Sequence, residues 1–391
     1  MKNNIIIVLV FLFWINQAKS QNVGKIVIGT KHIIHSSILK ENREYWISLP
    51  ESYHKKELSY KKYPLLFILD GNVHFRAISG IVNYMSFDLH SNTKIPEMIV
   101  IGIKNVNRRR DYTPDKVVTR RKNDSGGVEN FLRFLKEELI PKLDKKYRTT
   151  NYRILFGHSL GGLLSVYAYM KEDSPFNAFI AADPSFGTWD CSTMDKKLDA
   201  VTSQSFKRFL YIATANWGKR NVKNRDRHVR LFDALNSKCE DEFYAKLEFF
   251  ENENHATIPL IAFYNGISSI FEGYGISYRD VNNMEELIQK YKSLSKRLSW
   301  EFDPPENLVN RIGYKVLKSK NQIDKEKAFA FFYLNTKNYP GSYNAFDSLG
   351  EAYEILGDNK MAIKNYKISL YLNPDNEHAS TKIKTLEIND N

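Results

Sequence analysis

The chain has 391 residues, a formal net charge of +12 and two cysteines, Cys191 and Cys239. Hydrophobic residues make up 42% and charged residues 26%, which excludes a disordered or fibrous chain and predicts two or three globular domains. The basic residues are spread along the chain and lie in no nucleic-acid-binding motif, so we expect no nucleic-acid partner. No cysteine or histidine spacing indicates zinc, and the two cysteines could form one disulfide in an oxidising compartment.

The N-terminus has the layout of a secretory signal peptide. Lys2 gives a positive start, Ile5 to Ile15 is an unbroken apolar run, and small residues follow at Ala18 and Ser20. We therefore expect residues 1–20 to be removed and the protein to be exported, either periplasmic or secreted. The run is shorter than the ~20 residues that span a bilayer, so we expect no stable membrane span after cleavage. An uncleaved anchor is the alternative.

Between residues 21 and 275, short apolar runs alternate with helical patterns. Buried strands are expected at 65–69, 98–103, 153–156, 209–213 and 246–250, after an alternating strand region at 25–49 and a polar loop at 51–63. Helices are expected at 128–147, 163–170 and 258–272. This alternation predicts an α/β fold with a doubly wound, mostly parallel sheet, the α/β-hydrolase fold.

After residue 275 helical patterns dominate. Residues 276–308 are interpreted as a helical linker and 309–391 as a small all-α domain of tetratricopeptide-like repeats. The evidence is a 34-residue register between matching positions, namely Ala328 and Ala362, Phe332 and Tyr366, and Pro340 and Pro374. The first copy is degenerate, and a generic amphipathic hairpin is the alternative. Two copies fall below the usual three, so packing against the larger domain or binding of a partner protein is expected.

The strongest chemical signal is a glycine-flanked serine, Gly157-His158-Ser159-Leu160-Gly161, between an apolar strand and an apolar helix. Such a tight strand-to-helix turn has no room for side chains two residues on either side of the serine, and it lifts the hydroxyl above the sheet. The pattern therefore predicts Ser159 as a catalytic nucleophile.

A serine hydroxyl needs a base, and the base needs an acid; in this fold they follow in the order serine, acid, histidine. His255 lies in a polar loop after the strand at 246–250 and is the predicted base, with His228 as the alternative. The predicted acid is Asp226, the one carboxylate in the loop at 216–227. A helix-capping role is the alternative for this aspartate.

The remaining site residues are inferred from position. The backbone N–H groups of Leu160 and Asn72 are the expected oxyanion donors, because each follows a central strand. Arg109, Arg110 and Trp189 are candidates for the substrate pocket, with ordinary surface as the alternative for the arginines. The positive net charge favours an anionic substrate.

Several motifs together resemble the putative esterase, or esterase D-like, family, which includes ferric enterobactin esterase and mycolyltransferase relatives. They are Tyr63–Gly71, Val100–Asn105, Arg110–Pro114, Asp183–Ser185 and Glu253–His255, and the resemblance covers about residues 30–272. It implies a serine hydrolase acting on esters without metal or cofactor, and it supports Ser159, His255 and Asp226. Some siderophore esterases of the family work with a Ser–His dyad, and Trp217 departs from the small polar residue or carboxylate common in relatives.

The sequence thus predicts a serine esterase that hydrolyses carboxylic esters through an acyl-enzyme on Ser159. A small-molecule ester is the expected partner, with siderophore or acylated-sugar esters as candidates. Two alternatives stay open: an inactive scaffold protein that uses its helical repeats, and an acyltransferase in which an alcohol replaces water.

Overall fold

A computed structural model describes residues 25–88, 93–115, 125–186, 198, 201, 206–218, 222–239, 243–281, 283–318 and 322–389. Its centre is an eight-stranded sheet with the order β1-β2-β4-β3-β5-β6-β7-β8. The strands are β1 (Thr30–Ser36), β2 (Glu41–Ser48), β3 (Tyr63–Ile68), β4 (Ile99–Ile103), β5 (Thr149–His158), β6 (Ala178–Ala182), β7 (Phe209–Ala215) and β8 (Ala245–Phe250). The β1/β2 and β2/β4 pairs are antiparallel and all other pairs are parallel. The predicted α/β-hydrolase fold is confirmed.

The strands follow from the apolar runs of the sequence. Every residue of β3, β4, β6 and β7 is buried, as expected for parallel strands covered on both faces. The outer strand β1 alternates between exposed and buried positions. The expected loop at 51–63 instead contains two short 3₁₀ turns, η1 (Glu51–His54) and η2 (Lys56–Leu58), before β3 begins.

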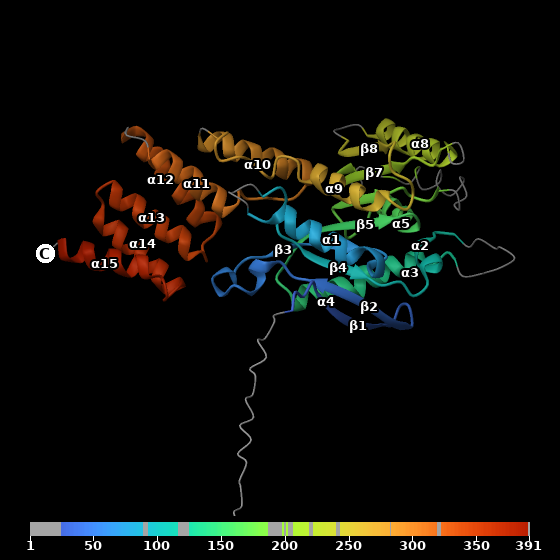
Figure 1. Ribbon diagram of the computed structural model, residues 1–391, viewed down its shortest axis with the longest axis horizontal. Helices are drawn as coiled ribbons and strands as arrows, with labels where there is room; N and C mark the ends of the chain where they lie inside the picture. The colour runs from blue at the N-terminus through green and yellow to red at the C-terminus, as the bar shows by residue number, and fades with distance from the viewer. Residues whose placement is uncertain are drawn as a thin grey trace, which may run out of the picture.

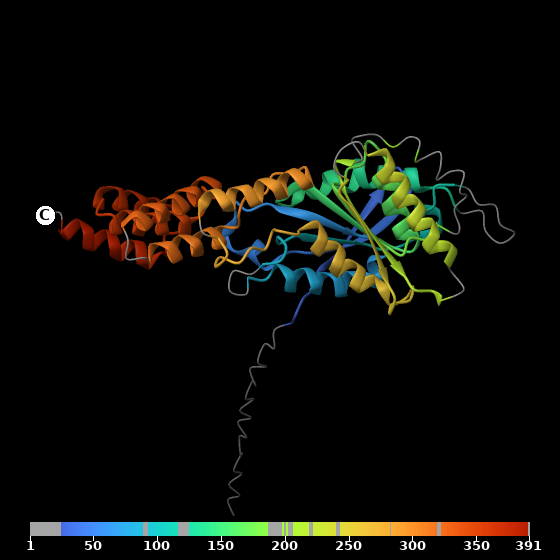
Figure 2. The ribbon, with the colours of Figure 1, turned by 90° about the horizontal axis from the view of Figure 1, so that it is seen from above.

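Helices cover both faces of the sheet (Figures 1 and 2). One face carries α1 (Gly71–Ser86) and α9 (Ile258–Ile270), whose apolar sides share a buried cluster with the strands. The other face is covered by a second buried cluster and by five helical elements: α3 (Val128–Arg133), the π-helical turn η3 (Phe134–Leu139), α4 (Ile140–Lys146), α5 (Leu160–Met170) and α8 (Val222–Lys238). The single helix expected at 128–147 is thus three consecutive helical segments.

The C-terminal part is helical and extends from one end of the sheet domain (Figure 1). Its helices are α10 (Met284–Leu298), α11 (Glu306–Leu317), α12 (Gln322–Asn338), α13 (Tyr343–Ile355), α14 (Asn359–Leu372) and α15 (Glu377–Asn389). Glycines allow two helix pairs to approach closely: a Cβ on Gly313 would lie 2.8 Å from the Phe332 ring, and one on Gly350 2.8 Å from the Tyr366 ring. The assignment of these helices to the tetratricopeptide class stays a prediction.

The first two of these helices belong to the core of the sheet domain. Leu287 and Leu294 of α10, and Leu308 and Ile312 of α11, lie in the same buried cluster as Tyr152 of β5. The segment interpreted as a linker is therefore packed against the sheet domain, and the helical part is attached through an apolar interface.

Within the described ranges, no helix has the length and apolar character needed to cross a membrane. The expected signal peptide at 1–20 lies outside the described residues, as do Cys191 and Trp189. The partner cysteine of the suggested disulfide, Cys239, is half-buried and packs against the core on the α5 face. Pairing of the two cysteines stays a prediction.

Candidate active site

Ser159 lies in the turn between β5 and α5, with a backbone φ of 60° and ψ of −115°. The flanking glycines leave room for a close contact between the strand and the helix. A Cβ on Gly157 would lie only 2.1 Å from the carbonyl oxygen of Gly161. A Cβ on Gly161 would itself come within 3.3 Å of a carboxylate oxygen of Asp70. The strand and helix therefore pack too closely for side chains here, and the serine is lifted to the N-terminus of α5, where the helix dipole favours negative charge.

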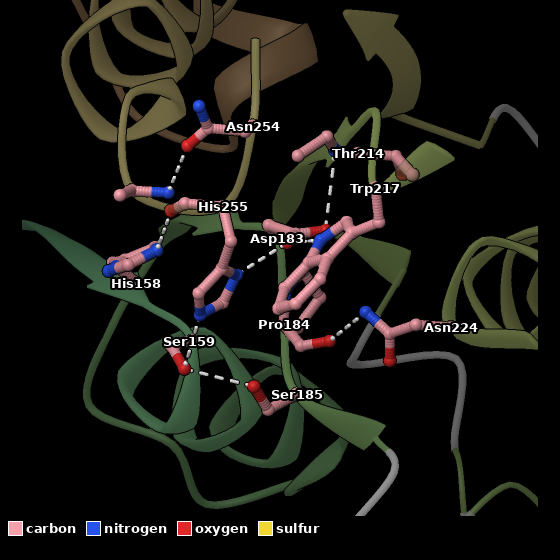
Figure 3. A network of polar contacts seen from close by, with 12 residues as sticks. His158, Ser159, Asp183, Pro184, Ser185, Thr214, Trp217, Asn224, Asn254 and His255 are labelled. Carbon is pink, nitrogen blue, oxygen red and sulfur yellow. Dashed lines mark hydrogen bonds and ion pairs between the residues drawn. The ribbon is translucent and has the colours of Figure 1, made fainter. Parts of the chain in front are cut away.

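His255 lies in the loop between β8 and α9, and its ring points at the serine (Figure 3). Its Nε2 atom is 3.0 Å from Ser159 Oγ. The backbone carbonyl of His255 accepts a 2.7 Å hydrogen bond from Nε2 of His158, which holds the loop against the end of β5. The structure thus brings together the two residues that the sequence singled out as nucleophile and base.

The carboxylate beside the imidazole is Asp183, which directly follows β6. Its Oδ2 atom is 2.6 Å from Nδ1 of His255 (Figure 3). Burial alone would raise the pKa of Asp183, but hydrogen bonds from His255, Trp217 and the backbone N–H of Ala215 outweigh burial and lower the pKa below its usual value. The carboxylate is therefore ionised at neutral pH and accepts the Nδ1 proton.

Asp226, the acid expected from the sequence, is not brought to this place. It is exposed on α8, which begins at Val222, and it makes no hydrogen bond or ion pair with the described residues. The sequence did contain a signal for Asp183: the triplet Asp183-Pro184-Ser185 follows an apolar run at 178–182 and lies between the serine and the histidine. The strand at 178–182 was not recognised, so the triplet was counted among the family motifs but Asp183 was not considered as the acid.

His228, the alternative base, is fully buried, and its ring nitrogens bond to groups other than Ser159. Its Nε2 donates to the carbonyl of Pro184 at 2.7 Å, and its Nδ1 accepts from the hydroxyl of Thr214 at 2.9 Å. Burial lowers the pKa of His228, which keeps it neutral and suits this pair of bonds. His228 supports the loop that carries Asp183.

Two aromatic rings flank the imidazole of His255. The rings of His158 and Trp217 each have centroids 4.5 Å from it, at interplanar angles of 43° and 46°. Burial, together with the nearby His255 and His74, lowers the pKa of His158 to about 4, so this ring is neutral at physiological pH. The hydroxyl of Ser185 lies 2.9 Å from that of Ser159 on the side away from β5 (Figure 3).

The expected oxyanion donors lie at two helix starts. Leu160 is the first residue of α5 and Asn72 the second of α1, where backbone N–H groups have no carbonyl partner within their helix. Arg108 joins the two starts: its Nε donates to Asp70, the residue before α1, at 2.8 Å, and its Nη2 to the carbonyl of His158 at 2.8 Å. The assignment of both N–H groups to the oxyanion stays a prediction.

The structure separates the candidate pocket residues. Arg110 pairs with Glu41 of β2 at 2.6 Å and with Asp111 at 2.7 Å, so its charge ties α2 (Arg108–Tyr112) to the sheet and is not available to a substrate. Arg109 is half-buried and its side chain has no ion pair among the described residues. Trp189 lies outside them. In the described part of the chain no cluster of three or more His, Cys, Asp or Glu side chains could hold a metal ion.

A serine on a strand-to-helix turn, an imidazole at hydrogen-bonding distance and a buried carboxylate behind the imidazole are the parts of a serine hydrolase. The strand order and this arrangement define the class. A sequence model of the putative esterase family matches residues 36–255, more than half of the chain, and the chain belongs to this family. It is a carboxylic ester hydrolase.

Similar proteins of known name are siderophore esterases. The ferri-bacillibactin esterase BesA of Bacillus subtilis is 27% identical over 216 residues, which are 50% of this chain and 74% of BesA. A siderophore triacetylfusarinine C esterase of Aspergillus fumigatus is 25% identical over 145 residues, 36% of this chain and 50% of that protein.

Solved structures support the fold in both parts of the chain. The crystal structure of an IroE-like serine hydrolase from Shewanella oneidensis has a TM-score of 0.68 at 24% identity and covers 79% of this chain and 99% of its own. An uncharacterised protein from Capnocytophaga ochracea has a TM-score of 0.61 at 20% identity and covers 92% of this chain and 99% of its own. Coverage of this extent includes C-terminal helices as well as the sheet domain.

Proposed function

We propose that this protein hydrolyses esters through an acyl-enzyme on Ser159, with His255 as general base and Asp183 as the orienting acid. The observation that carries the proposal is the hydrogen-bonded series from Ser159 Oγ to His255 Nε2 at 3.0 Å and from His255 Nδ1 to Asp183 Oδ2 at 2.6 Å. A scaffold protein without activity has no need for a buried carboxylate behind a loop imidazole, since burying a charge is costly.

Acylation begins when His255 Nε2 takes the hydroxyl proton as Ser159 Oγ attacks the ester carbonyl. The carbonyl oxygen gains negative charge, which the N–H groups of Leu160 and Asn72 stabilise. Asp183 stabilises the imidazolium and keeps its Nδ1 proton in place. His255 then gives the Nε2 proton to the leaving alcohol, and a water molecule, activated in the same way, releases the acid and restores Ser159.

The substrate class that we propose is siderophore esters, with acylated sugars as the second class. The support is the similarity to BesA and to the triacetylfusarinine C esterase, both named for siderophore substrates. Arg109, which has no ion pair among the described residues, and the net charge of +12 suit an anionic ester. We further propose export through the N-terminal segment, with the C-terminal helices as the surface for any protein partner.

Replacing the nucleophile tests the mechanism. Ser159→Ala removes the attacking oxygen, so hydrolysis of p-nitrophenyl acetate should fall by about 10⁴-fold or more, and a fluorophosphonate probe should no longer label the protein. Ser268→Ala is the matched control, because among the described residues that hydroxyl bonds only to the Tyr264 carbonyl of its own helix. Wild-type rates and labelling in Ser159→Ala would contradict the proposal.

The substrate class is tested separately on the wild-type protein. Ferri-bacillibactin, triacetylfusarinine C and acetylated sugars are offered at equal concentration, and products are identified by mass spectrometry. Higher kcat/KM on the siderophores supports the first class. Cleavage of the sugars alone would replace it with the second.

A further inference from the structure

The Asp183 carboxylate serves two ring N–H groups at once. Its Oδ2 atom is 2.6 Å from Nδ1 of His255 and also 2.6 Å from Nε1 of Trp217 (Figure 3). The second oxygen, Oδ1, accepts from the backbone N–H of Ala215 at 3.2 Å. The catalytic imidazole therefore shares its acceptor atom with an indole.

The same indole also lies against the imidazole, and it is 39% exposed. The ring centroids of Trp217 and His255 are 4.5 Å apart, and His158 contacts the imidazole at the same distance. His158 reaches it from the end of β5 and Trp217 from the loop after β7, so the ring is held between two elements. Trp217 thus contacts both the base and the acid while its outer edge meets solvent.

The backbone around Trp217 is fixed to the loop that carries His255. The backbone N–H of Asn216 donates to the carbonyl of Glu253 at 2.8 Å, and its side-chain amide donates to the carbonyl of Glu251 at 2.9 Å. The amide oxygen of Asn216 accepts from the N–H of Gly218 at 2.9 Å, which closes the turn around the indole. The loops after β7 and β8 therefore form one hydrogen-bonded unit with Trp217 at its centre.

We propose that Trp217 is a positioning residue that fixes the Asp183 carboxylate and limits how strongly it holds the proton of His255. This inference rests on the proposed function. Without the indole N–H, Oδ2 would interact with His255 alone and Asp183 would lose one of its three donors. The stronger interaction would stabilise the imidazolium relative to the neutral ring, and the looser carboxylate would orient the ring less well.

A substitution at Trp217 leaves the other charged and titratable groups around the His255 imidazole in the protein. The imidazole meets Ser159 and His158 from the β5 turn and Asp183 from the loop after β6. Three groups act on those neighbours and stay in place, namely His74 of α1, Arg108 of α2 and His228 of α8. The acid limb of the pH profile therefore reports the change at Trp217.

The test uses the full chain with Trp217→Phe, which removes the N–H and keeps a ring, and Trp217→Leu, which removes both. Trp46→Phe is the matched control, because its indole N–H also donates to a carboxylate, Glu44 at 2.7 Å, three strands away from β5. The kcat/KM on p-nitrophenyl acetate and the rate of fluorophosphonate labelling are measured from pH 4 to 9. Thermal unfolding by circular dichroism checks that each variant folds.

Both Trp217 variants should lose about tenfold in kcat/KM at the optimum, the scale of one hydrogen bond to a charged group. The acid limb of each pH profile should move up by about half a pH unit or more, since Oδ2 of Asp183 would then interact with His255 alone. Trp46→Phe should match the wild type. Wild-type rates and an unmoved acid limb in Trp217→Phe would overturn the inference, and so would a shift seen in Trp217→Leu alone.

A second measurement uses the wild-type protein and therefore does not depend on whether the Trp217 variants fold. Proton exchange of the Trp217 indole N–H, followed by NMR in the wild type, should be slow despite the exposed ring, because the N–H is bonded to Asp183. Fast exchange would overturn the inference. Failure of the proposed function would give a different result from failure of this inference. If the proposed function is wrong, Ser159→Ala keeps wild-type hydrolysis, whatever the Trp217 variants do.

Discussion

Asp183 combines an unusual backbone with a fully bonded side chain. Its φ of 40° lies in the left-handed region, which costs a residue with a Cβ about 1 kcal/mol or more. Its side chain is 1% exposed and accepts N–H groups from His255, Trp217 and Ala215. The bonds offset the strain and leave the carboxylate one orientation, in which Nδ1 of His255 carries the proton and Nε2 is free to take one from Ser159.

Asp183→Asn tests the acid. The amide keeps the shape and tolerates a positive φ, but it cannot stabilise an imidazolium, and its NH₂ group favours the wrong imidazole tautomer. We expect kcat to fall by about 10³- to 10⁴-fold with little change in melting temperature. Stopped-flow or steady-state assays with p-nitrophenyl acetate give the rate, and circular dichroism gives the melting curve.

Asp226→Asn is the control for this substitution. The residue is exposed on α8 and has no bonded partner among the described residues, so we expect wild-type kcat. A loss at Asp226 as large as that at Asp183 would return the acid role to the residue that chain order first suggested. Wild-type activity in both variants would indicate a Ser–His dyad.

The sequence could place Ser159 and His255 near one another, because a glycine-flanked turn and a loop after the last strand occupy the same edge of the sheet. It could not choose the acid. Both Asp183 and Asp226 satisfy the order serine, acid, histidine, and the strands before them are neighbours about 4.8 Å apart. Which carboxylate reaches Nδ1 of His255 depends on the residue at which α8 begins and on the turn at Asp183. Neither of these can be predicted from the spacing of residues in the sequence. The ion pair of Arg110 with Glu41 could not be predicted for a similar reason, since the two residues are distant in sequence.

At the scale of elements, the turn from β5 to α5 depends on the absence of side chains. A Cβ at Gly157 would lie 2.1 Å from the Gly161 carbonyl oxygen and 2.3 Å from its carbonyl carbon, which are backbone atoms that cannot move aside. The close approach fixes Ser159 above the sheet. The geometry of the nucleophile and the packing of α5 on β5 are therefore one feature.

Gly157→Ala should prevent normal folding, because the clash exceeds what a marginally stable domain tolerates. Gly80→Ala is the matched control: this glycine lies within α1, and a Cβ there would meet nothing within 4 Å. It should raise the unfolding free energy by about 0.5–1 kcal/mol. Soluble yield and urea unfolding measure both effects, and an active, folded Gly157→Ala protein would contradict the described turn.

The buried strands β3 and β4 were predicted, because each is a continuous run of large apolar residues. The region at 128–147 was recognised as helical but not as interrupted: it contains the π-helical turn η3, a rare conformation that the sequence analysis did not consider. The strand β6 was missed because five small and apolar residues, Ala178–Ala182, also suit a buried helix.

At the scale of the whole molecule, the packing of the C-terminal helices on the sheet domain determines whether the stability of one part depends on the other. Helices α10 and α11 share a buried cluster with β5, α9 and α1. Arg297 of α10 also donates to the carbonyl of Ser269, in the last turn of α9, at 3.0 Å and to that of Glu272, just after α9, at 2.6 Å. Packing of the repeats against the larger domain was expected from their low copy number, but residues 276–308 were interpreted as a linker, because the apolar face of a helix does not show in the sequence which surface it packs against.

This attachment predicts that core substitutions in the helical part act differently along its length. Ile312 of α11 is fully buried in the cluster shared with the sheet, so Ile312→Ala should cost about 2–5 kcal/mol and lower the temperature at which esterase activity is lost. Leu386 of α15 is 5% exposed but lies in a separate cluster with α14. Leu386→Ala should therefore weaken the last helices and leave that temperature near the wild-type value.

Residual activity after heating, measured beside helical circular dichroism, separates the two variants. In Ile312→Ala both signals should fall together at a lower temperature, because α11 is part of the sheet domain's core. In Leu386→Ala part of the helical signal should be lost first while hydrolysis continues. Equal loss of activity in the two variants would mean that the helices from α11 to α15 unfold with the sheet domain as one unit.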